Sequence, residues 1–103
     1  GSVFAYGLLG TIYRSDDLGN SWQALESGTR GSLFGAAVAA DGSMVFVGLD
    51  GAVQLTRDGN SFVTLDQGPR RSLLGVAPLR SGSFMVTGTS GSAPLDNITG
   101  NGR

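Results

Sequence analysis

The stretch SDDLGNSW, residues 15–22, decides the fold of this chain. An aspartate, a glycine and an aromatic residue follow one another here at a spacing that suits a tight hairpin turn. We predict that the Asp17 carboxylate accepts backbone N–H bonds inside the loop, that Gly19 takes a positive φ, and that the Trp22 ring buries between neighbouring sheets. The expected hydroxyl partners of the aspartate are Ser15 and Ser21.

A second version of this turn reads TRDGNSF, residues 56–62. It lacks the residue between the aspartate and the glycine, and phenylalanine replaces tryptophan. The segment is therefore either a degenerate form of the same turn or a tight Asp-Gly hairpin. Its predicted structural residues are Thr56, Asp58, Gly59 and Phe62.

A longer repeat surrounds the two turns. The segment SVFAYGLLG at 2–10 returns as SMVFVGLDG at 43–51 and as SFMVTGTSG at 83–91, offset by 41 and then 40 residues. Trp22 and Phe62 are also offset by 40 residues. A repeat of this length indicates one blade of a β-propeller, since the best-known propeller repeat has roughly 40–45 residues.

The composition favours short strands joined by turns. The chain has 103 residues, of which 18 are glycine, and only 15% are charged. Its apolar runs are short, rich in Val, Phe, Leu and Tyr, and bracketed by Gly, Ser, Asp or Asn, while no segment has a helical period. We predict strands near 3–8, 11–15, 21–26, 33–40, 44–49, 52–56, 61–65, 73–79 and 84–88, with a tenth near 92–95.

These strands predict an all-β chain, a partial β-propeller of about two and a half four-stranded antiparallel blades. The units are an incomplete first blade at 1–32, a complete second blade at 33–72, an incomplete third blade at 73–97 and a polar C-terminal tail at 98–103. Closed propellers have roughly four to eight blades. We therefore expect a piece of a longer protein, cut at its start, whose open sheet edges need a partner or the missing remainder of the propeller.

The run GTIYRSDDLGNSW at 10–22 and the glycines at 7, 48 and 88 resemble the Asp-box, or BNR-repeat, β-propellers. That group includes sialidases, other glycoside hydrolases, sortilin-type receptors and the photosystem II stability/assembly-factor family. The resemblance covers about residues 2–91, is closest to the assembly-factor family, and implies a non-enzymatic, bacterial, assembly-factor-like scaffold that binds protein. Because Asp-box propellers are often exported, it also implies a periplasmic or secreted location.

The residues that the chain lacks limit its chemistry. It has no histidine and no cysteine, which excludes nucleophilic catalysis and metal sites that depend on these residues within the chain. The aspartates mostly stand in turns, and Glu26 ends a predicted strand, so we predict no catalytic residue, no metal and no cofactor. A net charge of −1 argues against nucleic acid as a partner. The longest apolar stretch, around 33–40, falls far short of the ~20 residues of a membrane span.

The arginines are more suggestive than the acids. All seven basic residues are arginine, and Arg30 and Arg70 hold equivalent repeat positions just before the first strand of successive blades, with Arg71 beside them. Repeat symmetry places them on one rim, where planar guanidinium groups could bind carboxylates, phosphates or an acidic loop of a protein partner. A Gly-x-Arg turn that recurs for local structural reasons, or arginine-rich codon usage, would explain the same pattern.

Two other functions stay open from the sequence. The chain could be a fragment of a sialidase-like, glycoside-hydrolase-like or glycan-binding propeller whose active site lies in missing blades. The arginines, with Tyr6, Tyr13 and Glu26, supply the residue types of a sialidase without a matching local motif. Short chains could instead associate into a homo-oligomer that completes a ring.

Overall fold

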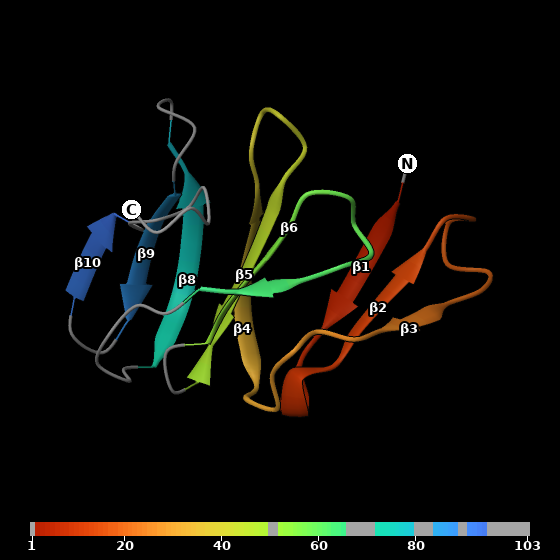
Figure 1. Ribbon diagram of the computed structural model, residues 1–103, viewed down its shortest axis with the longest axis horizontal. Helices are drawn as coiled ribbons and strands as arrows, with labels where there is room; N and C mark the ends of the chain where they lie inside the picture. Colours follow the sequence, from red (N-terminus) through yellow and green to blue (C-terminus); the bar gives the residue numbers. More distant parts are fainter. Residues whose placement is uncertain (1, 50–51, 66–71, 80–83, 89–90, 95–103) are drawn as a thin grey trace.

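Ten strands form three antiparallel sheets in chain order in the computed structural model, which describes residues 2–49, 52–65, 72–79, 84–88 and 91–94. Each sheet is made of consecutive strands, and the second sheet lies between the other two (Figure 1). The predicted polar tail at 98–103 lies outside the described residues. The short period-two segments of the sequence therefore fold as hairpins and meanders.

The strand bounds follow the repeat. The first sheet contains β1 (Val3–Tyr6), β2 (Ile12–Ser15) and β3 (Gln23–Leu25). The second contains β4 (Leu33–Val38), β5 (Met44–Gly48), β6 (Val53–Thr56) and β7 (Val63–Thr64), and the third pairs β8 (Leu73–Pro78), β9 (Phe84–Gly88) and β10 (Gly91–Pro94). Each of the first nine predicted strands contains an observed strand, and the tenth, expected near 92–95, overlaps β10.

The first predicted strand, 3–8, is wrong at its end. The strand stops at Tyr6, and residues Leu8–Gly10 form a short 3₁₀ turn, η1. Leu9 has φ 58°, a left-handed conformation that breaks the strand, and the Thr11 N–H donates to the Leu8 carbonyl at 3.1 Å. The apolar character of Leu8 suggested a longer strand, although the side chains of Leu8 and Leu9 are both more than 70% exposed.

β5, an inner strand of the second sheet, is apolar on both faces because another sheet lies against each face. Successive strand residues point to opposite sides. Val45 and Val47 belong to the cluster shared with the third sheet, whereas Met44 and Phe46 pack in the cluster shared with the first sheet. The continuous run MVFV is thus typical of a strand that is buried on both faces.

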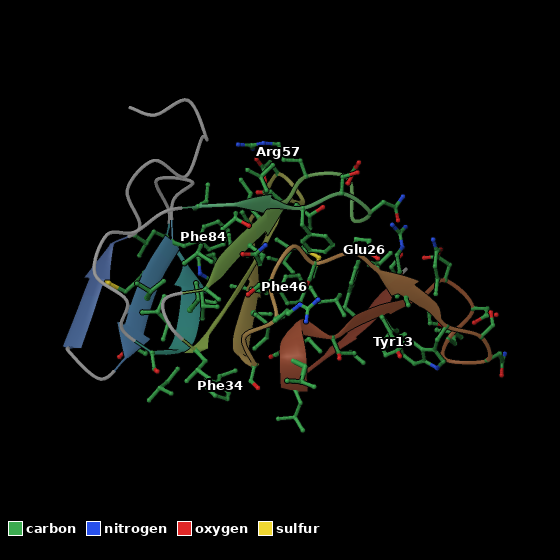
Figure 2. The ribbon with its side chains drawn as sticks, turned by 60° about the horizontal axis from the view of Figure 1, so that its bottom comes forward. Tyr13, Glu26, Phe34, Phe46, Arg57 and Phe84 are labelled. Atoms are coloured by element: carbon green, nitrogen blue, oxygen red, sulfur yellow. The ribbon has the colours of Figure 1, made fainter. Side chains whose placement is uncertain are left out.

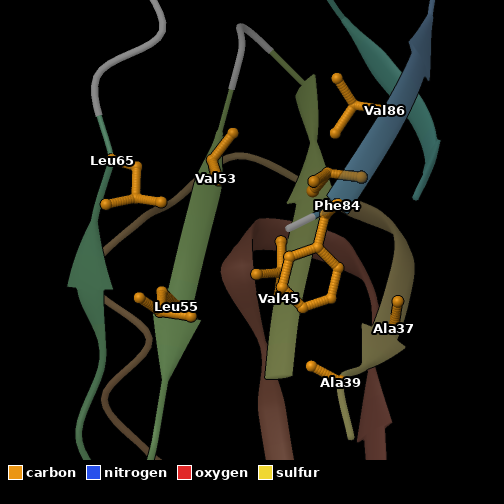
Figure 3. Close-up of a cluster of buried hydrophobic side chains, with 9 residues drawn as sticks. Ala37, Ala39, Val45, Val53, Leu55, Leu65, Phe84 and Val86 are labelled. Atoms are coloured by element: carbon orange, nitrogen blue, oxygen red, sulfur yellow. The ribbon is translucent and has the colours of Figure 1, made fainter. Parts of the chain in front are cut away.

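Figure 3 shows the cluster between the second and third sheets. The Phe84 ring of β9 is fully buried beside Val45 and Ala37, and Val86 packs in the same layer. The rest of the cluster comes from the second sheet and its flanking residues: Val47 of β5, Val53 and Leu55 of β6, Ala39 just after β4 and Leu65 just after β7. These side chains hold the second sheet to the third by apolar burial.

The cluster between the first and second sheets is aromatic. Phe46 is 0% exposed, and three rings surround it: Tyr6 edge-on at 5.3 Å, Phe62 edge-on at 5.8 Å and Phe4 tilted at 6.3 Å between centroids. Ile12 is buried in the same cluster. Edge-on and tilted contacts at these separations are favourable for aromatic rings.

The first sheet lacks a strand that the other two possess. Gly48 lies against the backbone of Ser32 and Leu33, just where β4 begins, and Gly88 is equally close to Ser72 at the start of β8. A Cβ at either glycine would collide with a carbonyl oxygen. The equivalent Gly7 has no atom within 4 Å of its Cβ position, because no described strand pairs with that edge of β1.

We expect Phe46→Ala to lower the free energy of unfolding by about 3–5 kcal/mol, because the substitution leaves a cavity where three rings meet. Urea denaturation followed by circular dichroism measures the change. Leu8→Ala, at an exposed apolar side chain, is the control and should cost within about 0.5 kcal/mol. Equal effects of the two substitutions would contradict a central packing role for Phe46.

Candidate protein-interaction surface

The antiparallel strands sort the connections into two ends of the molecule. We call the end with the β2–β3, β4–β5 and β6–β7 turns the Asp-turn end, because it contains Asp17 and Asp58. The opposite end contains η1 and the connections β3–β4 and β5–β6, and we call it the Arg30 end (Figure 1). Arg30 and the two Asp turns therefore lie at opposite ends of the sheets.

The first Asp turn is closed by hydrogen bonds to one carboxylate. Asp17 Oδ1 accepts the backbone N–H of Ser21 at 2.8 Å and the Ser15 hydroxyl at 2.8 Å, while the Ser21 hydroxyl donates to Oδ2 at 2.5 Å. The Gly19 N–H donates to Ser15 Oγ at 2.8 Å, and Gly19 has φ 91°. These contacts are the ones expected of Ser15, Asp17, Gly19 and Ser21.

The electrostatics of Asp17 follow from these donors. The Ser21 hydroxyl, then the Ser21 backbone N–H, then the Ser15 hydroxyl stabilise the ionised carboxylate and lower the pKa of Asp17 from 3.8 to about 2. The carboxylate therefore stays charged at neutral pH and is committed to closing its own turn.

The second Asp turn has one residue fewer and is closed by the same kinds of hydrogen bond. Asp58 Oδ1 accepts the backbone N–H groups of Asn60 and Ser61, both at 2.8 Å. The Thr56 hydroxyl accepts the Gly59 N–H at 2.9 Å and donates to Asp58 at 3.2 Å. The backbone N–H of Ser61, followed by that of Asn60, lowers the pKa of Asp58. The shortened turn is thus held by its carboxylate as the longer one is.

The predicted burial of Trp22 between neighbouring sheets is wrong. The indole is 45% exposed, and its Nε1–H donates to the Gly19 carbonyl at 3.1 Å within its own turn. Its repeat counterpart Phe62 does pack between two sheets, edge-on to Phe46. The difference arises because Trp22 lies on the far face of the first sheet, where no described sheet covers it.

Arg14 joins the first sheet to the second Asp turn, a role that the sequence did not reveal. Its Nη1 donates to the Gly59 carbonyl at 3.1 Å and to Asn60 Oδ1 at 3.0 Å, and its Nε pairs with Asp16 at 2.9 Å. The guanidinium also lies 5.7 Å from the centre of the Phe4 ring. A Cβ at position 59 would approach Arg14 Nη1 to 2.7 Å, so glycine makes this contact possible.

Gln54 is the second residue that the sequence analysis missed. It is fully buried on the face of β6 that meets the first sheet, and its Nε2 donates to the Ser27 carbonyl and to Thr64 Oγ1, the latter at 2.9 Å. An amide side chain between the apolar residues Val53 and Leu55 was the available signal. The side chain ties the segment that leaves β3 to the neighbouring sheet.

Arg30 is exposed at the Arg30 end. It lines a shallow pocket of 340 Å³ whose other walls include Leu9, Leu25 and Glu26. Arg70 and Arg71, its predicted companions, lie outside the described residues. Their placement on the same rim as Arg30 therefore stays a prediction from the repeat.

Apolar side chains accompany Arg30 at this end, which the sequence analysis did not predict. The start of β4 contacts η1, because the Leu33 N–H donates to the Gly7 carbonyl at 2.9 Å, and it meets the β5–β6 connection through the Leu49 N–H and the Ser32 carbonyl at 2.9 Å. Figure 2 shows the Phe34 side chain outside the sheets. The exposed apolar residues near these strand starts are Leu8, Leu9, Phe34, Leu49 and Leu74.

Neither end contains a metal centre among the described residues, where no three acidic, histidine or cysteine side chains come together. Within the same residues, no helix is long and apolar enough to cross a membrane. Glu26, the one glutamate of the chain, lies beside Arg30 at the pocket and has no second carboxylate among the described residues that line it. The surface at the Arg30 end therefore offers the Arg30 guanidinium, the Glu26 carboxylate and apolar contacts.

The three successive sheets, each packed against the next, define part of a β-propeller. A solved structure titled "YCF48 bound to D1 peptide" has the same fold, with a TM-score of 0.62, 23% sequence identity and coverage of 93% of this chain. The match spans 32% of the length of that structure. No family model matches the sequence, and no curated protein matches it significantly.

We expect the melting temperature to fall as the pH drops from about 4 to about 2. A carboxyl whose pKa is lowered by folding stabilises the native state above its unfolded pKa, and that stability is lost as the pH falls through the folded pKa. Asp17→Asn should remove part of this dependence, as melts by circular dichroism across this pH range can show. The slope that remains belongs to the other lowered carboxyls, including Asp58. Superimposable pH profiles of the two proteins would rule out the role of Asp17.

We expect Arg14→Lys to lower the free energy of unfolding by about 1–2 kcal/mol, because an ammonium keeps the charge but loses the planar fork that reaches the second Asp turn. Denaturant unfolding measures the loss. Arg30→Lys, at an exposed arginine on the opposite end, is the matched control and should be nearly neutral. A neutral Arg14→Lys would show that Arg14 does not hold the two sheets together.

Proposed function

We propose that this chain belongs to a non-enzymatic, assembly-factor-like β-propeller scaffold that binds protein, and that the Arg30 end is its binding surface. The observation that supports this function is the exposure of Arg30 beside Leu9 at one pocket, at the end of the sheets where Leu8 is also exposed. Tyrosine, tryptophan and arginine anchors surrounded by apolar contacts are typical of protein interfaces. An exposed cation next to apolar side chains suits a peptide with acidic and apolar residues.

The Asp-turn end is a weaker candidate because its carboxylates are occupied by their own turns. Asp17 and Asp58 each accept at least two hydrogen bonds from neighbouring residues. Arg14 is likewise engaged between the two sheets. The side chains of the Arg30 end are more available for a partner, since Arg30 and the leucines of η1 are exposed.

The structural likeness is consistent with a protein partner. The matched structure contains YCF48 with a bound D1 peptide, and propellers present connections from several sheets on one rim. From the repeat we expect Arg70 and Arg71, which lie outside the described residues, to extend the surface around Arg30. A bacterial origin and a periplasmic or secreted location are part of the same proposal and rest on the resemblance alone.

Binding of acidic and apolar peptides tests this function. We expect the chain to bind members of a peptide array in which acidic and apolar positions vary, and Arg30→Ala with Arg70→Ala to weaken that binding by about tenfold or more. The melting temperature should be nearly unchanged, because Arg30 is exposed. Fluorescence anisotropy with the best peptide measures the affinity.

Arg57→Ala is the matched control, since it removes one arginine from the Asp-turn end. It should leave peptide affinity unchanged. An equal loss in the control would indicate nonspecific charge attraction. Unchanged affinity in the double variant would overturn the assignment of the Arg30 end.

A further inference from the structure

One face of the first sheet is apolar, and no other described strand covers it. Strand register places Val3 opposite Ser15 and Ala5 opposite Tyr13, so these side chains share the face that points away from the second sheet. Trp22 lies on the same side, because its neighbour Gln23 pairs with Arg14 on the other face. We call Val3, Ala5, Tyr13 and Trp22 the back face. Val3 and Tyr13 are each 42% exposed and Trp22 is 45% exposed.

Each back-face residue has a buried or partly buried counterpart one repeat later. Offsets of 40 or 41 residues pair the back face with the set Met44, Phe46, Gln54 and Phe62. In the second sheet this set packs against the first sheet, with Phe46 and Gln54 at 0% exposure. Figure 2 shows Phe46 at this inner interface and Tyr13 away from it. The back face is thus one half of an inter-sheet contact that the chain already forms.

The third sheet has a face of the complementary kind, on the side that points away from the second sheet. Register places Ala77 opposite Met85, on the face that points away from the second sheet, and Thr87 shares that face. We call these three residues the front face. Their counterparts, offset by 40 residues, are Ala37, Val45 and Val47, which form the buried contact of the second sheet with the third.

The back face and the front face therefore correspond, by repeat position, to the two kinds of face that pack together inside the chain. The contacts between the first and second sheets and between the second and third sheets each join a front-type face to a back-type face. The back face and the front face contain no charged residue, so no charge would have to be desolvated when they meet. An uncovered apolar sheet face also marks an interaction site.

We propose that the front face of the third sheet packs on the back face of the first sheet in a second copy of this chain. The contact is heterologous, head to tail, and repeats the geometry of the two inner interfaces, so copies add in one rotational direction and can close into a ring. Trp22 becomes partly buried at this contact, as Phe62 is at the inner one. The proposal is independent of peptide binding at the Arg30 end, because the faces involved are different.

The emission of Trp22 reports the contact directly, since it is the one tryptophan in the chain. Analytical ultracentrifugation over a concentration series should show masses rising to multiples of 10.5 kDa. Over the same series the emission maximum of Trp22 should move to shorter wavelength. A monomer at every concentration, or association without any change in Trp22 emission, would overturn the proposal.

Two variants establish the head-to-tail geometry. Tyr13→Lys places a charge in the back face, and Met85→Lys places a charge in the front face. Each variant alone should therefore remain monomeric. An equimolar mixture should form a one-to-one dimer, because one intact front face and one intact back face remain. This rescue also shows that both variants are folded.

Leu8→Lys, at an exposed leucine outside both faces, is the control and should associate like the unchanged chain. Association of Met85→Lys alone would indicate back-to-back pairing of first sheets, which contradicts the proposal. A mixture that stays monomeric would contradict it as well.

Discussion

The second sheet must be apolar on both faces, and the rest of the structure depends on this constraint. Phe46 fills the contact with the first sheet, while Val45 and Val47 fill the contact with the third. Because neighbouring residues of one strand serve different interfaces, a shift of register by one residue would exchange the two contacts. The aromatic cluster around Phe46 therefore sets how the first sheet sits on the second, and with it the position of the Asp turns and of the Arg30 end.

Polar side chains add two kinds of hydrogen bond to this apolar core, one within surface turns and one between sheets. At the surface, Asp17 and Asp58 close their turns with local hydrogen bonds, which a short segment forms by itself. Between sheets, Arg14 and Gln54 bind backbone carbonyls far away in sequence, where an unpaired carbonyl would be costly. The local bonds define hairpins, and the distant bonds fix one hairpin relative to the next. An exposed cation such as Arg30 remains available for a partner.

Much of the fold was predictable because its signals are local. Alternation, bracketing glycines and a repeat of about 40 residues located all ten strands, and the turn residues of SDDLGNSW predicted their own hydrogen bonds. The predictions failed where a distant sheet decides the outcome. Trp22 and Phe62 occupy equivalent repeat positions, yet only Phe62 has a sheet against its ring. The apolar group around η1 was missed because Leu8 was predicted as the last residue of a strand.

The sequence by itself determined the strands, the carboxylate-closed turns and the propeller-like repeat, because these depend on interactions between residues close along the chain. Only the tertiary structure decided which apolar residues are buried, which arginine is engaged and which face remains uncovered. Burial is set by the sheet that lies opposite, and that sheet is built from residues about one repeat away. Arg14 is bound to the second Asp turn while Arg30 faces solvent, although both are arginines of the same first repeat.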